Sequence, residues 1–497
     1  MSRRLAPLLS LLLLAACSSE PDDSPTSDMS PTPGEDMAAG DMSMSTEGDM
    51  LDPPVTEDDM GSTPEDMGNP PITDMASNPP DADMSTPPED MGTPQPRSLC
   101  APLEAPTGNT IIVTPAQASE LPSIIAAANT GDTILLEDGT YKSTLDGESS
   151  RRLIFRKPGI TLRSASGDPT KVIIDAEYKT NELVYVTTDD ITIAEVTLTR
   201  ARDHLVHATG NGATTTRNLR MHRVHFVDSG EQFVKINSTT QDGYVDDGEI
   251  TCSRFELTDA GRPEVERSPG GCYTGGVDAH ASRGWRIAHN HFEGIYCAGE
   301  GLAEHAVHFW RSSRDTIVEN NTIIDCARGV GFGLGNPVEK RVYADKPYDG
   351  VGAIEHFDGV IRNNVIFADI DFYDTGIELQ YARGAKVYHN TVMSTEGAAG
   401  FYTSIDYRFE TTLVDLHNNI ARRITSRNGG MANREGNLEG LALDLFVDPL
   451  NGDFHLVAGA AAIDAGVSLD GDSGLDLDGL PREDGKPDVG ADEFGVQ

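Results

Sequence analysis

Acidic and basic side chains recur at matching positions in the second half of this 497-residue chain. Four residues each lie twelve positions before an asparagine of a repeated motif, and each has a second residue two positions later: Asp278 with His280, Phe309 with Arg311, Glu378 with Gln380, and Asp406 with Arg408. An imidazole transfers protons near neutral pH, a guanidinium pairs with carboxylates, and carboxylate oxygens bind Ca²⁺. These residue types could bind a polar ligand and move a proton on it.

A spacing of two residues places both sets on one face of a strand. The residues between them, Ala279, Trp310, Leu379 and Tyr407, are mostly apolar and are expected to point into a core. The two sets then form an outward stripe across adjacent repeats. The alternative is an ordinary solvated face, because charged residues belong on surfaces.

The asparagine motif repeats along the chain. Asparagine falls at 290, 321, 364, 390 and 418, at intervals of 31, 43, 26 and 28 residues, and the apolar position beside it continues upstream at Phe255, Phe226 and Leu198. Between these points, short runs of alternating β-branched and polar residues, such as 190–193 and 196–199, are separated by Gly, Asn and Asp. This pattern predicts strands. One coil per interval predicts an all-β parallel solenoid in which the asparagines stack as a ladder inside a turn.

The first residues are typical of an export signal. Arg3 and Arg4 precede an apolar run that ends at Cys17, and this run is too short to span a membrane stably. The segment Leu14-Ala15-Ala16-Cys17 resembles the lipobox of bacterial lipoproteins, which implies cleavage after residue 16, lipidation of Cys17 and attachment to the outer membrane through the lipid anchor alone. The alternative is an ordinary secretory signal.

Residues 17–97 have the composition of a disordered linker. Pro, Ser, Thr, Gly, Asp and Met dominate, the Asp-Met pair recurs, and twenty acids with no Lys or Arg lie between 18 and 96. Such a segment cannot bury enough apolar area to fold. The boundaries predict a signal peptide at 1–16, this linker at 17–97 and the solenoid at 98–497. The formal net charge of −42 excludes nucleic acid as an expected partner.

Cysteine use agrees with export. Without Cys17 five cysteines remain, at 100, 252, 272, 297 and 326, so at least one has no partner within the chain. Cys252 and Cys272 bracket a loop rich in Gly, Pro and charge, and we expect a disulfide between them.

Residues 109–497 resemble the right-handed parallel β-helix proteins that include pectate lyases, alginate lyases and chondroitinase B. The resemblance rests on Asp132-Thr133-Ile134 with Asp138-Gly139-Thr140-Tyr141 near the start, on the coil beginning at 160, and on Asp488-Val489-Gly490-Ala491-Asp492-Glu493 near the end. It implies a right-handed parallel β-helix and a polysaccharide ligand.

For a lyase of this group, the chemistry needs a cation or metal at the sugar carboxylate, a base and a proton donor. His280 and Arg311 are the catalytic candidates, and Ca²⁺ could be held by Asp278, Glu300 or Glu304. The substrate-binding candidates are Asp278, Glu378, Gln380, Asp406 and Arg408. The family's second catalytic arginine would lie near 331–335, where this chain has glycines, and this departure favours a polysaccharide-binding protein over a uronate lyase.

Two further expectations follow. A long excursion from 336 to 352 is expected to wall a groove. The isolated histidines 204, 222, 305 and 356 are expected to be turn or surface residues rather than ligands.

Overall fold

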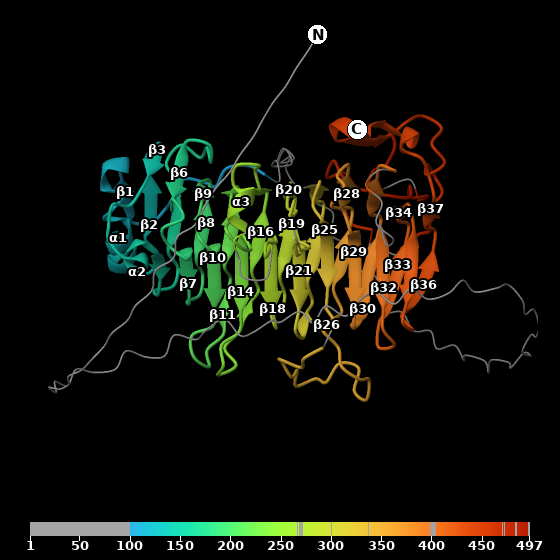
Figure 1. The fold of residues 1–497 in the computed structure, drawn as a ribbon, viewed down its shortest axis with the longest axis horizontal. Helices are drawn as coiled ribbons and strands as arrows, with labels where there is room; N and C mark the ends of the chain where they lie inside the picture. The colour runs from blue at the N-terminus through green and yellow to red at the C-terminus, as the bar shows by residue number, and fades with distance from the viewer. Residues whose placement is uncertain are drawn as a thin grey trace, which may run out of the picture. The chain divides into compact units, whose positions relative to one another are not determined.

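The computed structural model describes residues 100–495, apart from 266, 268–271, 300, 336, 397, 399–403, 470, 472, 483 and 484. The predicted signal, Cys17 and linker therefore lie outside the described residues, as does Glu300. The described chain winds through short strands that stack as three long parallel sheets (Figure 1). The expectation of a parallel β-solenoid is confirmed.

Each coil contributes one strand to each sheet in turn. The coil at 192–209, for example, supplies β8 (Thr192–Ala194), β9 (Thr197–Thr199) and β10 (His204–Thr209) to the three sheets. Strands pair only with the coils before and after, and every pair within the three long sheets of the described chain is parallel. Side chains of corresponding positions therefore lie directly above one another along the helix axis.

The remaining strands are given by sheet. The fourteen-stranded sheet also contains β1 (Thr110–Val113), β2 (Thr133–Leu136), β5 (Thr161–Ser164), β12 (Arg220–His222), β16 (Glu249–Thr251), β19 (Arg286–Ala288), β22 (Ser313–Arg314), β23 (Ile317–Glu319), β26 (His356–Phe357), β27 (Val360–Arg362), β30 (Ala382–Tyr388), β33 (Leu413–His417) and β36 (Met431–Glu435). The eleven-stranded sheet also contains β3 (Gly139–Tyr141), β6 (Val172–Asp175), β13 (His225–Val227), β17 (Arg254–Glu256), β20 (His291–Glu293), β24 (Thr322–Ile324), β28 (Val365–Ala368), β31 (Thr391–Ser394), β34 (Ile420–Ala421) and β37 (Leu438–Glu439).

The ten-stranded sheet also contains β4 (Leu153–Phe155), β7 (Glu182–Val186), β14 (Val234–Asn237), β18 (Val277–His280), β21 (His305–Trp310), β25 (Arg328–Phe332), β29 (Thr375–Gln380), β32 (Ile405–Arg408) and β35 (Ile424–Arg427). Two small sheets are formed by β11 (Thr216–Arg217) with β15 (Val245–Asp246), and by the antiparallel β38 (Phe446–Asp448) with β39 (Asp453–Leu456). The helical segments are α1 (Leu121–Ala127), α2 (Glu148–Arg151), α3 (Arg262–Val265), and the 3₁₀ turns at Pro115–Gln117, Leu443–Leu445 and Pro449–Asn451.

The asparagine ladder forms as predicted, with one correction. In each rung the side-chain Nδ2 of one asparagine donates to Oδ1 of the asparagine in the next coil at 2.8–3.0 Å, in the order Asn290, Asn321, Asn364, Asn390, Asn419 and Asn437. The ladder residue of its coil is Asn419, so the assignment of Asn418 was wrong. Asn418 instead takes the left-handed position before the rung (φ 56°), which His289, Asn320, Asn363 and His389 occupy in the other coils. Asn is among the residues that tolerate this conformation.

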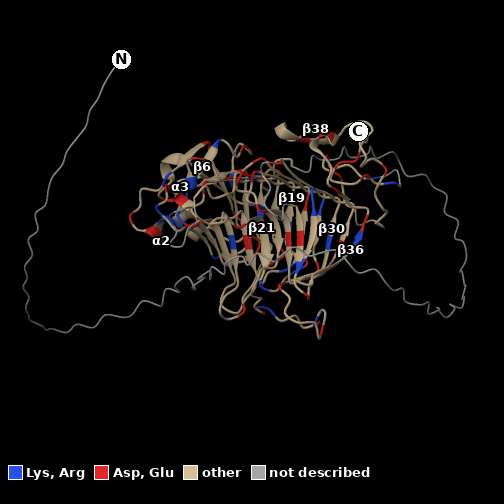
Figure 2. Cartoon of the chain, turned by 45° about the vertical axis from the view of Figure 1, so that its right-hand side comes forward, with Lys and Arg blue, Asp and Glu red and all other residues tan. Residues whose placement is uncertain are grey.

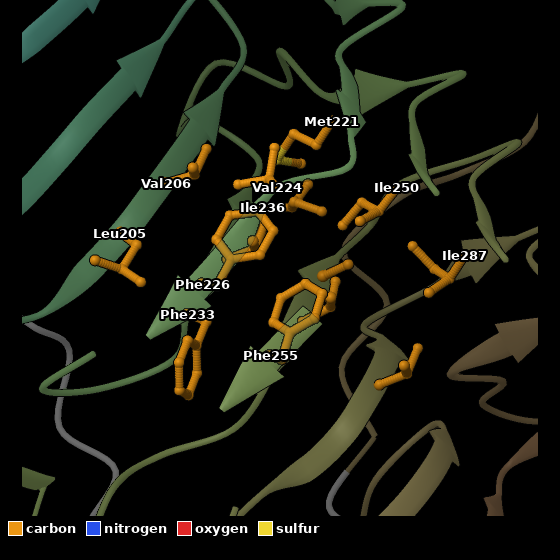
Figure 3. Packing of buried hydrophobic residues seen from close by; sticks show 14 of the residues in the cluster. Leu205, Val206, Met221, Val224, Phe226, Phe233, Ile236, Ile250, Phe255 and Ile287 are labelled. Carbon is orange, nitrogen blue, oxygen red and sulfur yellow. The ribbon is translucent and has the colours of Figure 1, made fainter. Parts of the chain in front are cut away.

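The core runs the length of the solenoid as stacks of aligned apolar side chains. Phe226, Phe255 and Phe292 stack face to face with ring centroids 4.4 Å apart, and Figure 3 shows the first two of these rings. They occupy the repeated apolar position seen in the sequence, which continues to Leu198 on one side and Ile323 on the other. The expectation that this position marks one coil per interval is confirmed.

The first coil and one face of the solenoid are covered by segments outside the three sheets. Helix α1 places Leu121 and Ile125 against the first coils. After β37 the chain folds back over the eleven-stranded sheet, where Phe454, Leu456 and Val489 pack against Phe367 and Met393. Among the described residues no helix has the length and apolar character needed to cross a membrane.

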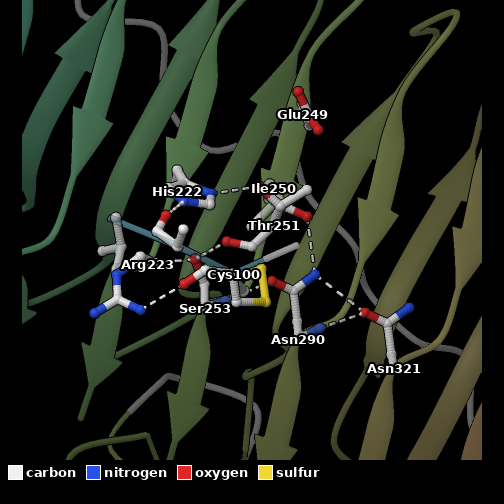
Figure 4. Close-up of a disulfide and its surroundings, with 12 residues drawn as sticks. Cys100, His222, Arg223, Glu249, Ile250, Thr251, Ser253, Asn290 and Asn321 are labelled. Atoms are coloured by element: carbon white, nitrogen blue, oxygen red, sulfur yellow. Dashed lines mark hydrogen bonds between the residues drawn. A yellow bond between two sulfur atoms is a disulfide. The ribbon is translucent and has the colours of Figure 1, made fainter. Parts of the chain in front are cut away.

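The disulfides differ from expectation. Cys252 bonds Cys100, and Cys272 bonds Cys297, while Cys326 is free and buried. The predicted Cys252–Cys272 pairing was therefore wrong, although the odd cysteine is confirmed. The Cys100–Cys252 disulfide attaches the start of the domain to a turn beside the asparagine ladder (Figure 4). The backbone carbonyl of Cys100 also accepts a hydrogen bond from the Arg223 guanidinium at 2.7 Å. Spacing along the chain could not reveal this pairing, because 152 residues separate the two cysteines.

Candidate functional site

The candidate site lies on the outward face of the ten-stranded sheet. In β18, Val277 and Ala279 belong to the core, which directs Asp278 and His280 outward. The strand register places Asp278 between Lys235 and His308, and the same position continues to Gly331, Glu378 and Asp406. We call these six residues the outward row. Figure 2 shows acidic and basic residues interleaved on the stacked strands.

One predicted pair lies elsewhere. Phe309 is a core residue, and Arg311 lies in the turn after β21, so placing both in the stripe was wrong. Their places are taken by His308 and Trp310, which means that Trp310, expected to point inward, points outward. The turn explains the shift: Arg311 and Ser312 are both left-handed (φ 54° and 67°), whereas directly after β18 Ala281 is left-handed (φ 53°) and Ser282 is not. The extra turn residue moves β21 by one position, and a one-residue shift exchanges the faces.

Asp406 is in the outward row for a different reason than predicted. It precedes the ladder residue Asn419 by thirteen residues, not twelve. The stretch between β32 and the ladder contains one more residue than the stretch between β18 and the ladder. This extra residue compensates for the choice of Asn418 instead of Asn419, so the predicted position of Asp406 is still correct.

Asp278 is buried, and both of its oxygens are engaged. Oδ2 contacts the ammonium of Lys235, and Oδ1 accepts a bond from Trp310 Nε1 at 2.7 Å, with His280 Nε2 3.5 Å away. Burial alone raises the pKa of Asp278, but Lys235 outweighs it and holds the pKa well below its ordinary value. Asp278 is thus an ionised partner of Lys235 and has no oxygen free for the predicted Ca²⁺.

The two catalytic candidates meet at Trp310. The His280 ring contacts it edge-on with centroids 4.7 Å apart, and the Arg311 guanidinium lies 4.3 Å from its centroid. Burial, aided by the charge of Lys235, lowers the pKa of His280 to about 4, so the imidazole is neutral at pH 7. Among the described residues the Arg311 guanidinium has no ion-pair partner. The structure therefore brings a neutral imidazole and an available cation to one aromatic ring.

Glu378 and Asp406 form a second buried network. Arg408 contacts Glu378 and donates to Asp406 from Nε at 2.9 Å, and Arg427 lies 3.5 Å from Asp406. Burial opposes ionisation of Glu378, but Arg328, His305 and Arg408 hold its pKa well below the ordinary value. Burial raises the pKa of Asp406 despite Arg408. Gln380 is also buried, so it offers little surface to a ligand.

Gly331 makes room for a histidine within the outward row. A Cβ at this position would lie 2.7 Å from the ring of His305, which fills the space and reaches Glu378 with Nε2 at 2.9 Å. The neighbouring His308 directs Nε2 to the carbonyl oxygen of Gly333 at 3.1 Å. The Glu304 carboxylate lies beside both rings, with Oε2 3.9 Å from His305 Nδ1 and 3.5 Å from His308 Nδ1.

The row is not an ordinary solvated face. Asp278, Glu378 and Asp406 of the row, and Gln380 beside it, are all at most 4% exposed, which contradicts the solvated alternative. The rim stays accessible, since the side chains of His280, Arg408 and Glu304 are 17%, 18% and 14% exposed. The excursion after 336 borders this rim beside Arg311, because the backbone N–H of Lys340 donates to Ser312 Oγ at 3.1 Å. The Glu355 carboxylate joins the two segments by accepting from the backbone N–H groups of Val338 and Arg311. A ligand would meet the edges of a buried polar network.

Sequence reasoning missed several members of this network. Lys235, His308 and Arg328 were not proposed as site residues, and Trp310 was assigned to the core. His204, His305 and His356 are buried strand residues, so expecting them at turns or on the surface was wrong. The cluster Glu304-His305-Ala306-Val307-His308 was the available signal, with three potential ligands in five residues.

No protein-family model matches the chain, and no curated protein matches its sequence. Among solved structures, the pectate lyase Pel9A is 17% identical, covers 78% of this chain and 96% of its own, and superposes with a TM-score of 0.52. The chain is a right-handed parallel β-helix protein. The chain is also similar to an alginate lyase from Paenibacillus sp. str. FPU-7, which is 17% identical, covers 65% of this chain and 98% of its own, and has a TM-score of 0.38. A polygalacturonase from Erwinia carotovora is 10% identical, covers 70% of this chain and 99% of its own, and has a TM-score of 0.35.

Proposed function

We propose that this β-helix protein binds a polysaccharide along the outward face of its ten-stranded sheet. The observation that carries the proposal is the outward row with its rim, where hydrogen-bond donors and acceptors are interleaved over successive strands. A sugar hydroxyl both donates and accepts, so a mixed row suits a polyhydroxyl chain, and parallel strands repeat the contacts about every 4.8 Å. The name of Pel9A, a pectate lyase with this fold, supports the same ligand class.

Arg311 favours a polymer that contains uronic acid. Its guanidinium is the kind of group that binds a carboxylate through two parallel hydrogen bonds. It stacks on Trp310, and Trp and Arg side chains supply much of the energy at binding sites. We infer that Arg311 binds a sugar carboxylate next to Trp310.

The first prediction tests this surface. Replacing His280 and Arg311 together by alanine should weaken binding to polygalacturonate, alginate or chondroitin sulfate at least tenfold, measured by isothermal titration calorimetry on the full chain. The unfolding free energy should fall by only about 1–2 kcal/mol, because both side chains are partly exposed and Asp278 keeps Lys235 and Trp310 as partners. Arg220→Ala is the matched control, since Arg220 lies on the fourteen-stranded sheet with its side chain 60% exposed. Equal binding by the double variant and the control would refute the proposal.

A uronate lyase is the second candidate, and the neutral His280 beside Arg311 favours it. In β-elimination a base removes the proton from C5, the C4–C5 double bond forms, and the C4–O bond breaks as the leaving oxygen gains a proton. Arg311 would neutralise the carboxylate and His280 would accept the C5 proton. Ultraviolet absorbance of the unsaturated product distinguishes the candidates: its appearance with any of these polymers establishes a lyase, and binding without it establishes a binding protein.

We also propose that acyl groups on Cys17 hold the protein at the outer membrane. Each buried CH₂ contributes about 0.8 kcal/mol, so several chains give durable attachment. Cys17→Ser should move the protein from the membrane fraction to the soluble fraction. Cys326→Ala, which removes the free buried cysteine, should leave fractionation unchanged. A Cys17→Ser protein that still sediments with membranes would exclude lipidation at this residue.

A further inference from the structure

Three buried polar atoms converge beside the outward row without a hydrogen-bond partner. They are Oε2 of Glu304, Nδ1 of His305 and Nδ1 of His308, and all lie within 4.8 Å of one another. The two histidines are fully buried in β21, and Glu304 precedes the strand directly. A buried polar atom without a partner costs free energy, so three that face one another call for a shared ligand.

The hydrogen bonds of the two rings determine what that ligand is. The carbonyl oxygen of Gly333 can only accept, so Nε2 of His308 carries the hydrogen. The Glu378 carboxylate contacts the Arg408 guanidinium with Oε1 and faces Nε2 of His305 with Oε2 at 2.9 Å, so Nε2 of His305 donates its hydrogen to Oε2. With the ring hydrogens on Nε2, the nitrogen that each ring offers to a metal ion is Nδ1, and both Nδ1 atoms face Oε2 of Glu304. Three lone pairs at one point attract a cation.

We propose that Glu304, His305 and His308 bind a divalent transition-metal ion such as Zn²⁺. Two imidazoles and one carboxylate form a ligand set suited to such ions, and three protein ligands leave one tetrahedral position for water or another ligand. Ligands about 2.0–2.2 Å from a tetrahedral ion lie roughly 3.3–3.6 Å apart. The 3.5 Å separation of Glu304 and His308 matches this, and the 3.9 Å separation of Glu304 and His305 needs only a small inward movement.

The surroundings of the three ligands support the assignment. Histidine ligands almost always donate the other ring N–H to a carboxylate or a backbone carbonyl, and here Glu378 and Gly333 accept these bonds. Gly331 is required as well, since any side chain there would displace the His305 ring. Ca²⁺ does not suit this site, because it takes six to eight oxygen ligands and only one carboxylate is present.

A second cluster of potential metal ligands does not have buried polar atoms without partners. His455, Asp478 and Asp492 are also close together, but both imidazole nitrogens of His455 are hydrogen bonded, to Asp453 at 2.6 Å and to Asp478 at 3.1 Å. Asp492 accepts a bond from the backbone of Leu456. These atoms already have partners within the protein.

The proposal is tested by measuring Zn²⁺ binding to the full chain. The protein is first treated with a chelator, and the titration is done in excess Mg²⁺, which occupies nonspecific carboxylate sites. Calorimetry should show one tight Zn²⁺ per chain, and Co²⁺ should give the visible absorption of a tetrahedral site. Glu304→Gln and His308→Gln should each weaken binding more than about a hundredfold, because loss of an outer partner alone costs 10–100-fold. His222→Gln is the control, since both nitrogens of His222 are engaged, by Thr251 and Ala101.

Glu304→Gln is the variant that decides the outcome, because it is nearly isosteric, partly exposed and loses no hydrogen bond of Oε2. Circular dichroism confirms that the fold is retained. The proposal would be overturned if the wild-type chain did not bind one Zn²⁺ per chain, or if the Glu304→Gln chain bound Zn²⁺ as tightly as wild type. Glu304 and His308 would then be interpreted as a pair that shares a proton. No glycan enters these measurements, so their result is separate from that of the polysaccharide proposal.

Discussion

Asn364→Ala is expected to lower the free energy of unfolding by about 3–5 kcal/mol. Oδ1 of Asn364 accepts from the backbone N–H and Nδ2 of Asn321 at 3.0 and 2.9 Å, and its Nδ2 donates to Val318 O and Asn390 Oδ1 at 2.9 Å. The substitution removes four buried hydrogen bonds, each with a net contribution of about 0.5–1.5 kcal/mol. It leaves the backbone N–H of Asn321 without this acceptor, whereas Nδ2 of Asn321 keeps Ile287 O and Oδ1 of Asn390 keeps the backbone N–H of residue 364. Urea unfolding followed by circular dichroism measures the loss.

Replacing an asparagine outside the ladder is the control, because it shows how much stability is lost when any asparagine is replaced by alanine. Asn433 is exposed on β36 and bonds only Asp415 among the described residues, at 2.7 Å. Asn433→Ala should change stability by within about 0.5 kcal/mol. If both variants unfold at similar urea concentrations, the ladder does not stabilise the solenoid as argued.

Lys235→Met is expected to cost about 3–5 kcal/mol of stability at neutral pH. The ammonium is the cation beside the buried Asp278, and removing one partner of a buried pair leaves an uncompensated charge. The stability from this pair is present while Asp278 is ionised, and it should be lost as pH falls through the depressed pKa of that carboxyl. Thermal and urea unfolding of wild type and variant measure both effects.

A double-mutant cycle isolates the pair. Adding Asp278→Asn to Lys235→Met removes the uncompensated charge but keeps an oxygen acceptor for Trp310, so more than half of the lost stability should return. Lys171→Met is the control, because Lys171 is 55% exposed and lies 3.6 Å from Asp168. A double variant less stable than Lys235→Met would show that the charge of Asp278 is stabilised by other groups.

The fold was predictable because its signal is local and repeated. Alternating strand runs such as 196–199 and the apolar series Leu198, Phe226, Phe255 each reflect one coil, and errors in one coil do not spread to others. The asparagine rungs were recognisable for the same reason, apart from the choice between Asn418 and Asn419. Two adjacent asparagines have the same side chain, and only the backbone conformation assigns one to the left-handed turn and the other to the ladder.

The site was predictable only as a sheet face. Asp278, His280, Glu378 and Asp406 were placed on the outward side, but the coil of β21 was shifted by one residue, which exchanged Phe309 for His308 and Arg311 for Trp310. The length of a single turn decides this register, and turn conformation depends on packing against the neighbouring coils. The disulfides were missed for a related reason, since their partners meet across coils.

The sequence alone determined that this protein is a parallel β-helix with a polar outward row, because repeat spacing and alternation specify which residues stack and which face the core. Only the tertiary structure decided that the row is a buried network and that Glu304, His305 and His308 converge on one point. That convergence needs Gly331, one coil later, to leave space for the His305 ring, and Glu378, two coils later, to orient it. Contacts between coils depend on side-chain directions in space, which residue order does not contain.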